Sequence, residues 1–201
     1  MNTIRLFSTA AACLLASIGA PLAVAQTLAP PAARTSDQAI HADYKAFEQT
    51  QARIQALNGP GRALRDYHLA KAQCWLDVSF HEYTRNDRSA FPQEALDQSV
   101  ALLQLMEQKA APLPMATALV NNAERLRPDL WSLADKLKGH EGLQCVARQV
   151  ACAEVELVHA GNEYRQQGWR HANPYVQMAE DLLAAAGAQA EACSAKPLRQ
   201  P

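Results

Sequence analysis

The sequence has few aromatic and β-branched residues, and neither sign of charge predominates. Aromatic residues make up 6% of the 201 residues, and valine and isoleucine together number 13, whereas alanine numbers 40. Because aromatic and β-branched residues favour strands and alanine favours helices, the composition predicts an all-α fold. The 19 basic and 20 acidic side chains give a formal charge of −1. This balance excludes the broad basic surface that nucleic-acid binding requires.

The sequence also lacks an apolar run long enough to be a convincing membrane span. In residues 1–25, Arg5 precedes a mostly apolar stretch at 10–18, and Ala-Val-Ala at 23–25 follows. This order is typical of a secretory signal peptide cleaved after Ala25. An uncleaved anchor and lipidation at Cys13 are the two alternatives. We therefore expect a signal peptide over 1–25 and a mature protein, without a membrane span, in the periplasm or associated with the outer membrane.

Motifs of the common enzyme classes are missing from the chain. No serine lies in a Gly-x-Ser-x-Gly motif, and no glycine-rich phosphate loop precedes an expected helix. The spacing of Cys145 and Cys152 does not match a zinc finger or ribbon. We therefore expect a non-enzymatic protein with no catalytic residue, no cofactor and no resident metal.

Four cysteines follow the expected signal peptide, at positions 74, 145, 152 and 193. An even number of cysteines in an exported protein predicts two disulfides. Cys145 and Cys152 are seven residues apart on one expected helix, which separates them by about 10 Å, whereas a disulfide needs Cα atoms within about 7 Å. A hairpin centred near residue 169 or 170 would bring Cys193 opposite about residue 146, which favours pairing with Cys145. We therefore expect the pairs Cys145–Cys193 and Cys74–Cys152.

Proline, glycine and apolar spacing divide the chain into six or seven expected helices. These cover approximately residues 37–57, 62–85, 92–106, 116–126, 128–138, 142–166 and 174–193. Residues 26–36, rich in proline and alanine, are expected to form a flexible lead-in, and residues 196–201 a tail. Short connections favour antiparallel neighbours, so we predict an antiparallel helical bundle over 37–195.

Two stretches of the sequence look like copies of one unit. EYTRNDRSAFPQEALDQSVALL begins at Glu82, and EYRQQGWRHANPYVQMAEDLL begins at Glu163. Each contains Glu-Tyr, an arginine, a proline and an amphipathic pattern in the same order. The pattern predicts two stacked αα-hairpins, with chance similarity between amphipathic hairpins as the alternative.

Histidines and carboxylates recur near the expected hairpin ends. Glu156 and His159 have the Glu-x-x-His spacing of carboxylate metal sites, but such sites use two of these motifs and this chain has one. The candidate polar cluster comprises Asp77, His81, Glu82, Glu156, His159, Glu163, Arg170 and His171. We interpret it as a hydrogen-bonded network in which Glu82 and Glu163 bind loop groups or Arg88 and Arg170. The alternative is a metal site formed by Asp77, His81, Glu156, His159 and Glu163.

Several segments resemble the helical N-terminal region of bacterial envelope proteins of the OmpA family. They are KAQCWLD at 71–77, FHEY at 80–83 and NDR at 86–88, followed by Cys152 to Glu154, Glu156, HAGNE at 159–163 and GWRH at 168–171. The resemblance covers about residues 62–193. In that family a C-terminal peptidoglycan-binding module usually follows the helical part, and we expect none here, so no binding residues are carried over. The resemblance implies an exported, envelope-associated helical domain.

The sequence therefore favours a non-enzymatic interaction or scaffold protein of the cell envelope. Its expected partner is another envelope protein or the cell wall, bound in a groove between the hairpins. One alternative is a periplasmic inhibitor or immunity-type protein, and another is a metal-binding protein that uses the carboxylate and histidine cluster. The oligomeric state is not predicted.

Overall fold

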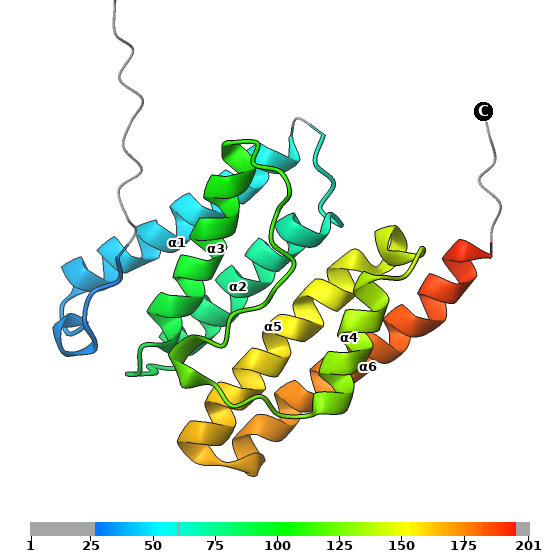
Figure 1. Ribbon diagram of the computed structural model, residues 1–201. Coiled ribbons are helices and arrows are strands. Elements are labelled where there is room, and N and C mark those ends of the chain that lie inside the picture. Colours follow the sequence, from blue (N-terminus) through cyan, green and yellow to red (C-terminus); the bar gives the residue numbers. More distant parts are fainter. Residues whose placement is uncertain (1–26, 60, 196–201) are drawn as a thin grey trace, which may run out of the picture.

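The computed structural model describes residues 27–59 and 61–195, which form six α-helices and no strand. The helices are α1 (Asp37–Asn58), α2 (Tyr67–Thr84), α3 (Phe91–Glu107), α4 (Pro128–Lys138), α5 (Leu143–Gln167) and α6 (Trp169–Ser194). Helices α1, α2 and α3 pack together, α4, α5 and α6 form a second group, and α2 packs against α5 where the groups meet (Figure 1). The predicted all-α bundle is confirmed.

Several of these helices begin close to the expected positions, at a capping side chain or a proline. The hydroxyl of Ser36 accepts a hydrogen bond from the backbone N–H of Ala39 and caps α1. Prolines stand in the first turns of α3 and α4, where a missing N–H costs little. Helix α2 begins at Tyr67, later than the expected residue 62, because the Asp66 carboxylate caps it by accepting from the N–H groups of residues 68 and 69.

The prediction of a helix at 116–126 is wrong. Only a 3-10 turn, Val120–Asn122, forms there, and Asn121 and Asn122 have positive φ angles of 50° and 53°. An α-helix cannot continue through left-handed residues. The segment instead crosses α5 at Gly161, where a Cβ atom would overlap the backbone of Glu124.

The prediction of a loop at 167–173 is also wrong. Gly168 alone separates α5 from α6, and its φ of 76° is one that glycine adopts without steric cost. Pro174 therefore lies inside α6 rather than at its start. The two stretches that resemble each other do form hairpins, α2–α3 and α5–α6. Because residues 85–90 connect the first pair and one glycine connects the second, the structure does not establish that they are copies.

The described part of the expected flexible lead-in, residues 27–36, packs against the bundle. Leu28 is buried, and its N–H donates to Oε1 of Gln93 on α3 at 2.6 Å. The N–H of Ala29 donates to the buried carboxylate of Asp43 on α1 at 2.7 Å. These backbone groups are satisfied by side chains of the bundle, which holds the segment in place. Residues 1–25, including Cys13, and the expected tail lie outside the described residues.

Helix α5 is the central element of the core. Val146, Val150 and Leu157 are completely buried, and α5 contacts α2, α4 and α6 (Figure 1). Two disulfides reinforce its position. Cys74–Cys152 joins α2 to α5 with a Cα–Cα distance of 5.4 Å, and Cys145–Cys193 joins α5 to α6 with a distance of 6.5 Å. The predicted pairing of the cysteines is confirmed.

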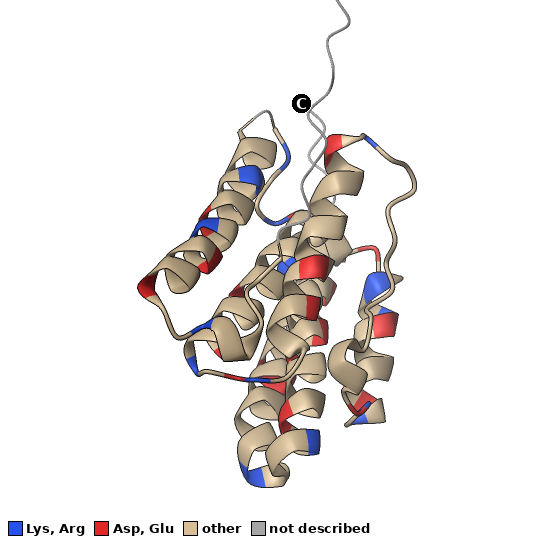
Figure 2. Ribbon diagram, turned by 90° about the vertical axis from the view of Figure 1, so that its left-hand side faces the viewer, with Lys and Arg blue, Asp and Glu red and all other residues tan. Residues whose placement is uncertain are grey.

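None of the helices in the described ranges has the length and apolar character needed to cross a membrane. Figure 2 shows both acidic and basic residues on most of the helices, whereas α3 carries only acidic ones, at Glu94, Asp97 and Glu107.

Candidate functional site: a buried polar cluster and an exposed groove

A cluster of polar side chains lies where the end of α2 meets α5 and α6. His81 and Glu82 belong to the last turn of α2, and His159 and Glu163 stand four residues apart on α5. Residues at this spacing share one face of a helix. Because α2 packs directly on α5, that face is brought against Glu82, and Tyr175 of α6 completes the group.

Both ring nitrogens of His159 face carboxylates. Nε2 lies 2.9 Å from Oε1 of Glu82, and Nδ1 lies 3.2 Å from Oε2 of Glu156. The imidazole is buried and packs against the rings of Phe91 and Tyr175. Burial alone would lower its pKa, but the hydrogen bonds to Glu156 and Glu82 outweigh burial, and the pKa of His159 is raised.

The two buried carboxylates of the cluster differ in their partners. Glu82 accepts from Arg85 at 3.1 Å as well as facing His159, and these cations lower its pKa despite burial. Glu163 lies 3.5 Å from Arg85 and 3.8 Å from His171, and its buried Oε2 atom accepts no hydrogen bond from any described residue. Burial and the charge of Glu82 raise the pKa of Glu163.

The outer edge of the cluster is open to solvent. Nε2 of His81 lies 3.1 Å from the hydroxyl of Tyr175, which also accepts from Arg85 at 2.9 Å. The side chains of His81 and Arg85 are substantially exposed. A polar cavity of about 170 Å³ adjoins Glu82 and Arg85, and its other lining residues are Asn86, Asp87, Arg88, Gln166 and Gln167. Small ions can therefore reach the cluster.

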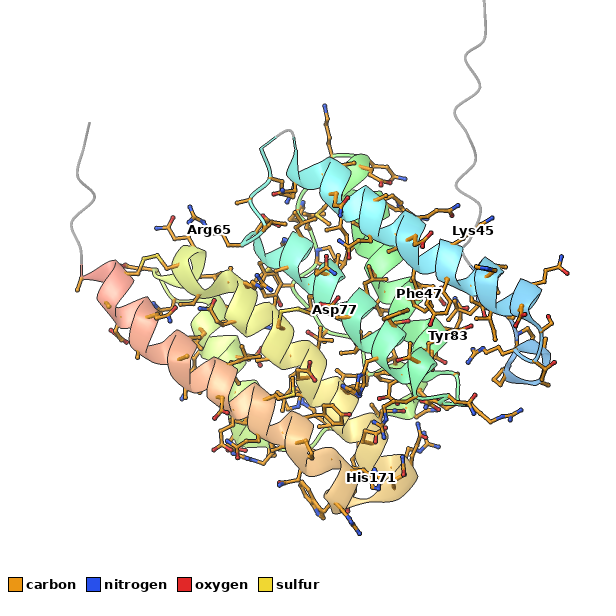
Figure 3. The ribbon with its side chains drawn as sticks, turned by 180° about the vertical axis from the view of Figure 1, so that it is seen from behind. Lys45, Phe47, Arg65, Asp77, Tyr83 and His171 are labelled. Carbon is orange, nitrogen blue, oxygen red and sulfur yellow. A yellow bond between two sulfur atoms is a disulfide. The ribbon has the colours of Figure 1, made fainter. Side chains whose placement is uncertain are left out.

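Most of the candidate residues from the sequence do meet here. His81, Glu82, Glu156, His159 and Glu163 come together, and His171 lies at the edge. Asp77 does not join them, because it lies on an exposed part of α2 and accepts from Gln73. Figure 3 shows Asp77 well apart from His171. Arg170 is exposed and forms no ion pair within the described part of the chain.

Sequence reasoning missed two members of the cluster. Arg85 performs the role that we expected of Arg88 or Arg170, and its position three residues after Glu82 was an available signal. Tyr175 carried no such signal, because the turn at Gly168 decides which face of α6 meets α5.

A second buried network lies near the beginning of α2. Lys71 is 1% exposed, and its Nζ donates to the Tyr67 hydroxyl at 2.8 Å, to the Thr117 hydroxyl at 2.5 Å and to Glu154 at 3.3 Å. Tyr67 also donates to Glu154, whose other oxygen accepts from Lys138 at 2.7 Å. Every charged group has a partner, and the network joins α2, α4 and α5 to the segment at 115–117. We assign it a structural role.

A groove lies on the opposite side of α2, between α1 and α2. We call it the α1–α2 groove, and it has a volume of about 300 Å³ and is lined by Tyr44, Phe47, Glu48, Gln51, Leu76, Asp77 and Phe80. The ring of Phe80 packs edge-on against Tyr44 and Phe47, with centroid distances of 5.6 and 5.1 Å. Phe47 and Asp77 both lie on this face (Figure 3).

Comparison with protein-family models, with curated proteins and with solved structures gives no match to this chain.

Proposed function

We propose that this protein is an exported, non-enzymatic interaction module of the bacterial cell envelope that binds a protein partner in the α1–α2 groove. Export is supported by the signal-peptide pattern at 1–25 and by the two disulfides, since such bonds persist in oxidising compartments. The cysteines of each pair are far apart in sequence, so the fold itself brings them together.

The observation that carries the binding role is the set of exposed aromatic side chains in the groove. Tyr44 and Phe80 retain 38% and 37% of their accessible surface, and Ile40 lies one helical turn before Tyr44. Exposed aromatics around a concavity are typical of protein-binding sites, because a partner gains most by burying such rings.

The charges beside the groove indicate what the partner carries. Glu48 and Asp77 line it and are exposed, while its floor is formed by apolar and aromatic groups. An apolar side chain can enter the groove, and a neighbouring lysine or arginine can pair with these carboxylates. We therefore expect a segment of an envelope protein that presents an apolar residue beside a basic one.

Site-specific photocrosslinking in the native cell tests this proposal. A photoreactive phenylalanine at position 80, and separately at position 44, should give an adduct with the same envelope protein, identified by mass spectrometry. A probe at Met178 on α6, which is also exposed, should not give this adduct.

Charge reversal supplies a matched comparison. The double variant Glu48→Lys, Asp77→Lys should abolish the adduct from position 80, because both carboxylates beside the groove become cations. Asp181→Lys changes an exposed acid on α6 and should leave the adduct intact. Equal adducts from positions 80 and 178, or adducts that survive the double variant, would refute a role for the groove. Retention of residues 1–25 with reduced cysteines in the native protein would refute export.

If the crosslinked protein is a toxin or a lytic enzyme, the interaction module is of the inhibitor or immunity type. Cosedimentation with purified cell wall, without a protein adduct, would instead contradict a protein partner.

A further inference from the structure

Three side chains that can bind a metal converge where α2 meets α5. Oε1 of Glu82 lies 2.9 Å from Nε2 of His159 and 3.5 Å from Nε2 of His81, and all three atoms lie within 4.8 Å of one another. Around a tetrahedral zinc ion with bonds of 2.0–2.1 Å, neighbouring ligand atoms are about 3.3 Å apart. We propose that His81, Glu82 and His159 form a binding site for one divalent transition-metal ion of the zinc class.

The proposal is independent of the groove and of partner binding. The separations of Glu82 from His159 and from His81 already approach the tetrahedral value. The third separation joins the two imidazoles, and the side chain of His81 is 47% exposed. Rotation of this exposed imidazole can close the third separation without disturbing the core. The metal would thus enter from the solvent side of the cluster.

The ligand types select the kind of metal. Two imidazoles and one carboxylate suit Zn²⁺ and its neighbours in the first transition row, whereas Mg²⁺ and Ca²⁺ prefer oxygen ligands alone. Three protein ligands leave one tetrahedral position for water. Because the side chain of His81 is 47% exposed, this position would lie on the solvent side of the cluster.

The buried histidine is already oriented for coordination. Glu156 lies 3.2 Å from Nδ1 of His159 and can accept a hydrogen bond from it, and Nε2 is directed at Glu82. A metal ion would take the place of the proton on Nε2. A carboxylate that holds the second nitrogen of a metal-binding histidine is a common feature of zinc sites, because it fixes the tautomer and the ring orientation.

The charge of the cluster is a second, independent observation that points to a cation. Glu82, Glu156 and Glu163 are three carboxylates, and Arg85 and the buried His159 are the cationic groups that face them. Oε2 of Glu163 is buried and lacks a hydrogen bond within the described ranges. A divalent ion that takes the place of the proton on Nε2 of His159 would add positive charge beside these carboxylates.

Besides the proton on Nε2 of His159, Arg85 opposes metal binding. Its Nη1 atom donates to the same oxygen of Glu82 that the metal would use, at 3.1 Å. The exposed guanidinium can move towards Glu163, which is 3.5 Å from the same nitrogen. Removal of this competing cation by Arg85→Gln should therefore leave zinc affinity unchanged or increase it.

Calorimetric titration of the purified, untagged and oxidised protein with ZnCl₂ tests the site. We expect one zinc ion per chain, and with Co²⁺ the intense visible absorption of four-coordinate cobalt. His81→Ala removes a ligand from an exposed position and should weaken zinc binding at least about 100-fold. This loss is larger than the one expected for a residue that only holds a ligand in place, as Glu156 does for His159. Far-UV circular dichroism should show an unchanged helical content.

His171→Ala is the matched control, because His171 borders the cluster but is not one of the three ligands. Its zinc affinity should stay within about 2-fold of the wild-type value, as for other surface substitutions. Zinc binding well below one equivalent, an octahedral cobalt spectrum, or equal losses in His81→Ala and His171→Ala would each overturn the proposal. None of these results bears on the groove, so failure of the metal site leaves the proposed function to its own test.

Discussion

At the scale of single residues, buried ionisable groups distinguish this bundle from a purely apolar one. Lys71, Glu82, Glu154, His159 and Glu163 are all nearly inaccessible to water. A charge removed from water is expensive unless it is paired, and removal of one partner leaves the other uncompensated. These residues form two separate networks along the interface between α2 and α5, and a shift of one helix along the other would break both. We infer that the networks fix the register of the two central helices.

The pH dependence of stability should report the burial of Lys71. Burial lowers its pKa from 10.5 to about 8, although Glu154 acts in the opposite direction. Between these values the unfolded chain binds more protons than the folded chain, so the free energy of unfolding should rise with pH. The free energy of unfolding of the wild type minus that of Lys71→Met should therefore increase by up to about 3 kcal/mol from pH 8 to pH 10.5.

Urea unfolding at several pH values measures this difference. Lys45→Met changes an exposed lysine of α1 and should follow the wild-type profile throughout. Parallel profiles of wild type and Lys71→Met would show that the buried amine does not titrate in this range.

At the scale of the helices and their connections, two glycines decide how neighbouring segments pass each other. Gly168 turns the chain from α5 into α6 within one residue, and Gly161 lets the segment after the 3-10 turn lie directly on α5. Neither role is visible in the apolar pattern. The pattern indicated where α1, α4 and α5 lie because their buried residues recur at helical spacing, but close approach of two backbones leaves no periodic signal.

Substitution of the glycines in α5 and α6 should have opposite effects. Gly161→Ala places a methyl group against the backbone of Glu124 and should lower the free energy of unfolding by roughly 1–3 kcal/mol. The methyl group that Gly187→Ala adds meets no neighbouring atom, and alanine is a better helix former than glycine. This substitution should therefore raise the free energy of unfolding by up to about 1 kcal/mol. Thermal and urea unfolding measure both. A neutral Gly161→Ala would mean that the crossing segment can move away from α5.

At the scale of the whole molecule, the disulfides link helices both between the two groups and within the second one. Cys74–Cys152 bridges the groups with a sequence separation of 78, and Cys145–Cys193 fastens the last helix with a separation of 48. Cross-links that close long loops restrict the unfolded chain strongly. The bundle should therefore depend on oxidation for much of its stability.

Removal of either disulfide should lower the free energy of unfolding by about 2–4 kcal/mol. The double variants Cys74→Ala, Cys152→Ala and Cys145→Ala, Cys193→Ala provide the comparison, and the first should lose slightly more because its loop is longer. Urea unfolding of the oxidised proteins measures the loss. An unchanged unfolding midpoint in both variants would show that packing alone supports the fold.

The sequence by itself determined the all-α class, the bounds of several helices and the cysteine pairing. The class and the helix bounds depend on local propensity and spacing. The pairing depends on helix geometry, which separates Cys145 from Cys152, and on the expected hairpin that brings Cys193 to Cys145. Only the tertiary structure decided that Asp77 lies on the groove side of α2 while His81 and Glu82 face the cluster, and that Arg85 and Tyr175 belong with His159. Which face of one helix meets another depends on the packing of whole surfaces and on turns such as Gly168, and no short stretch of residues encodes it.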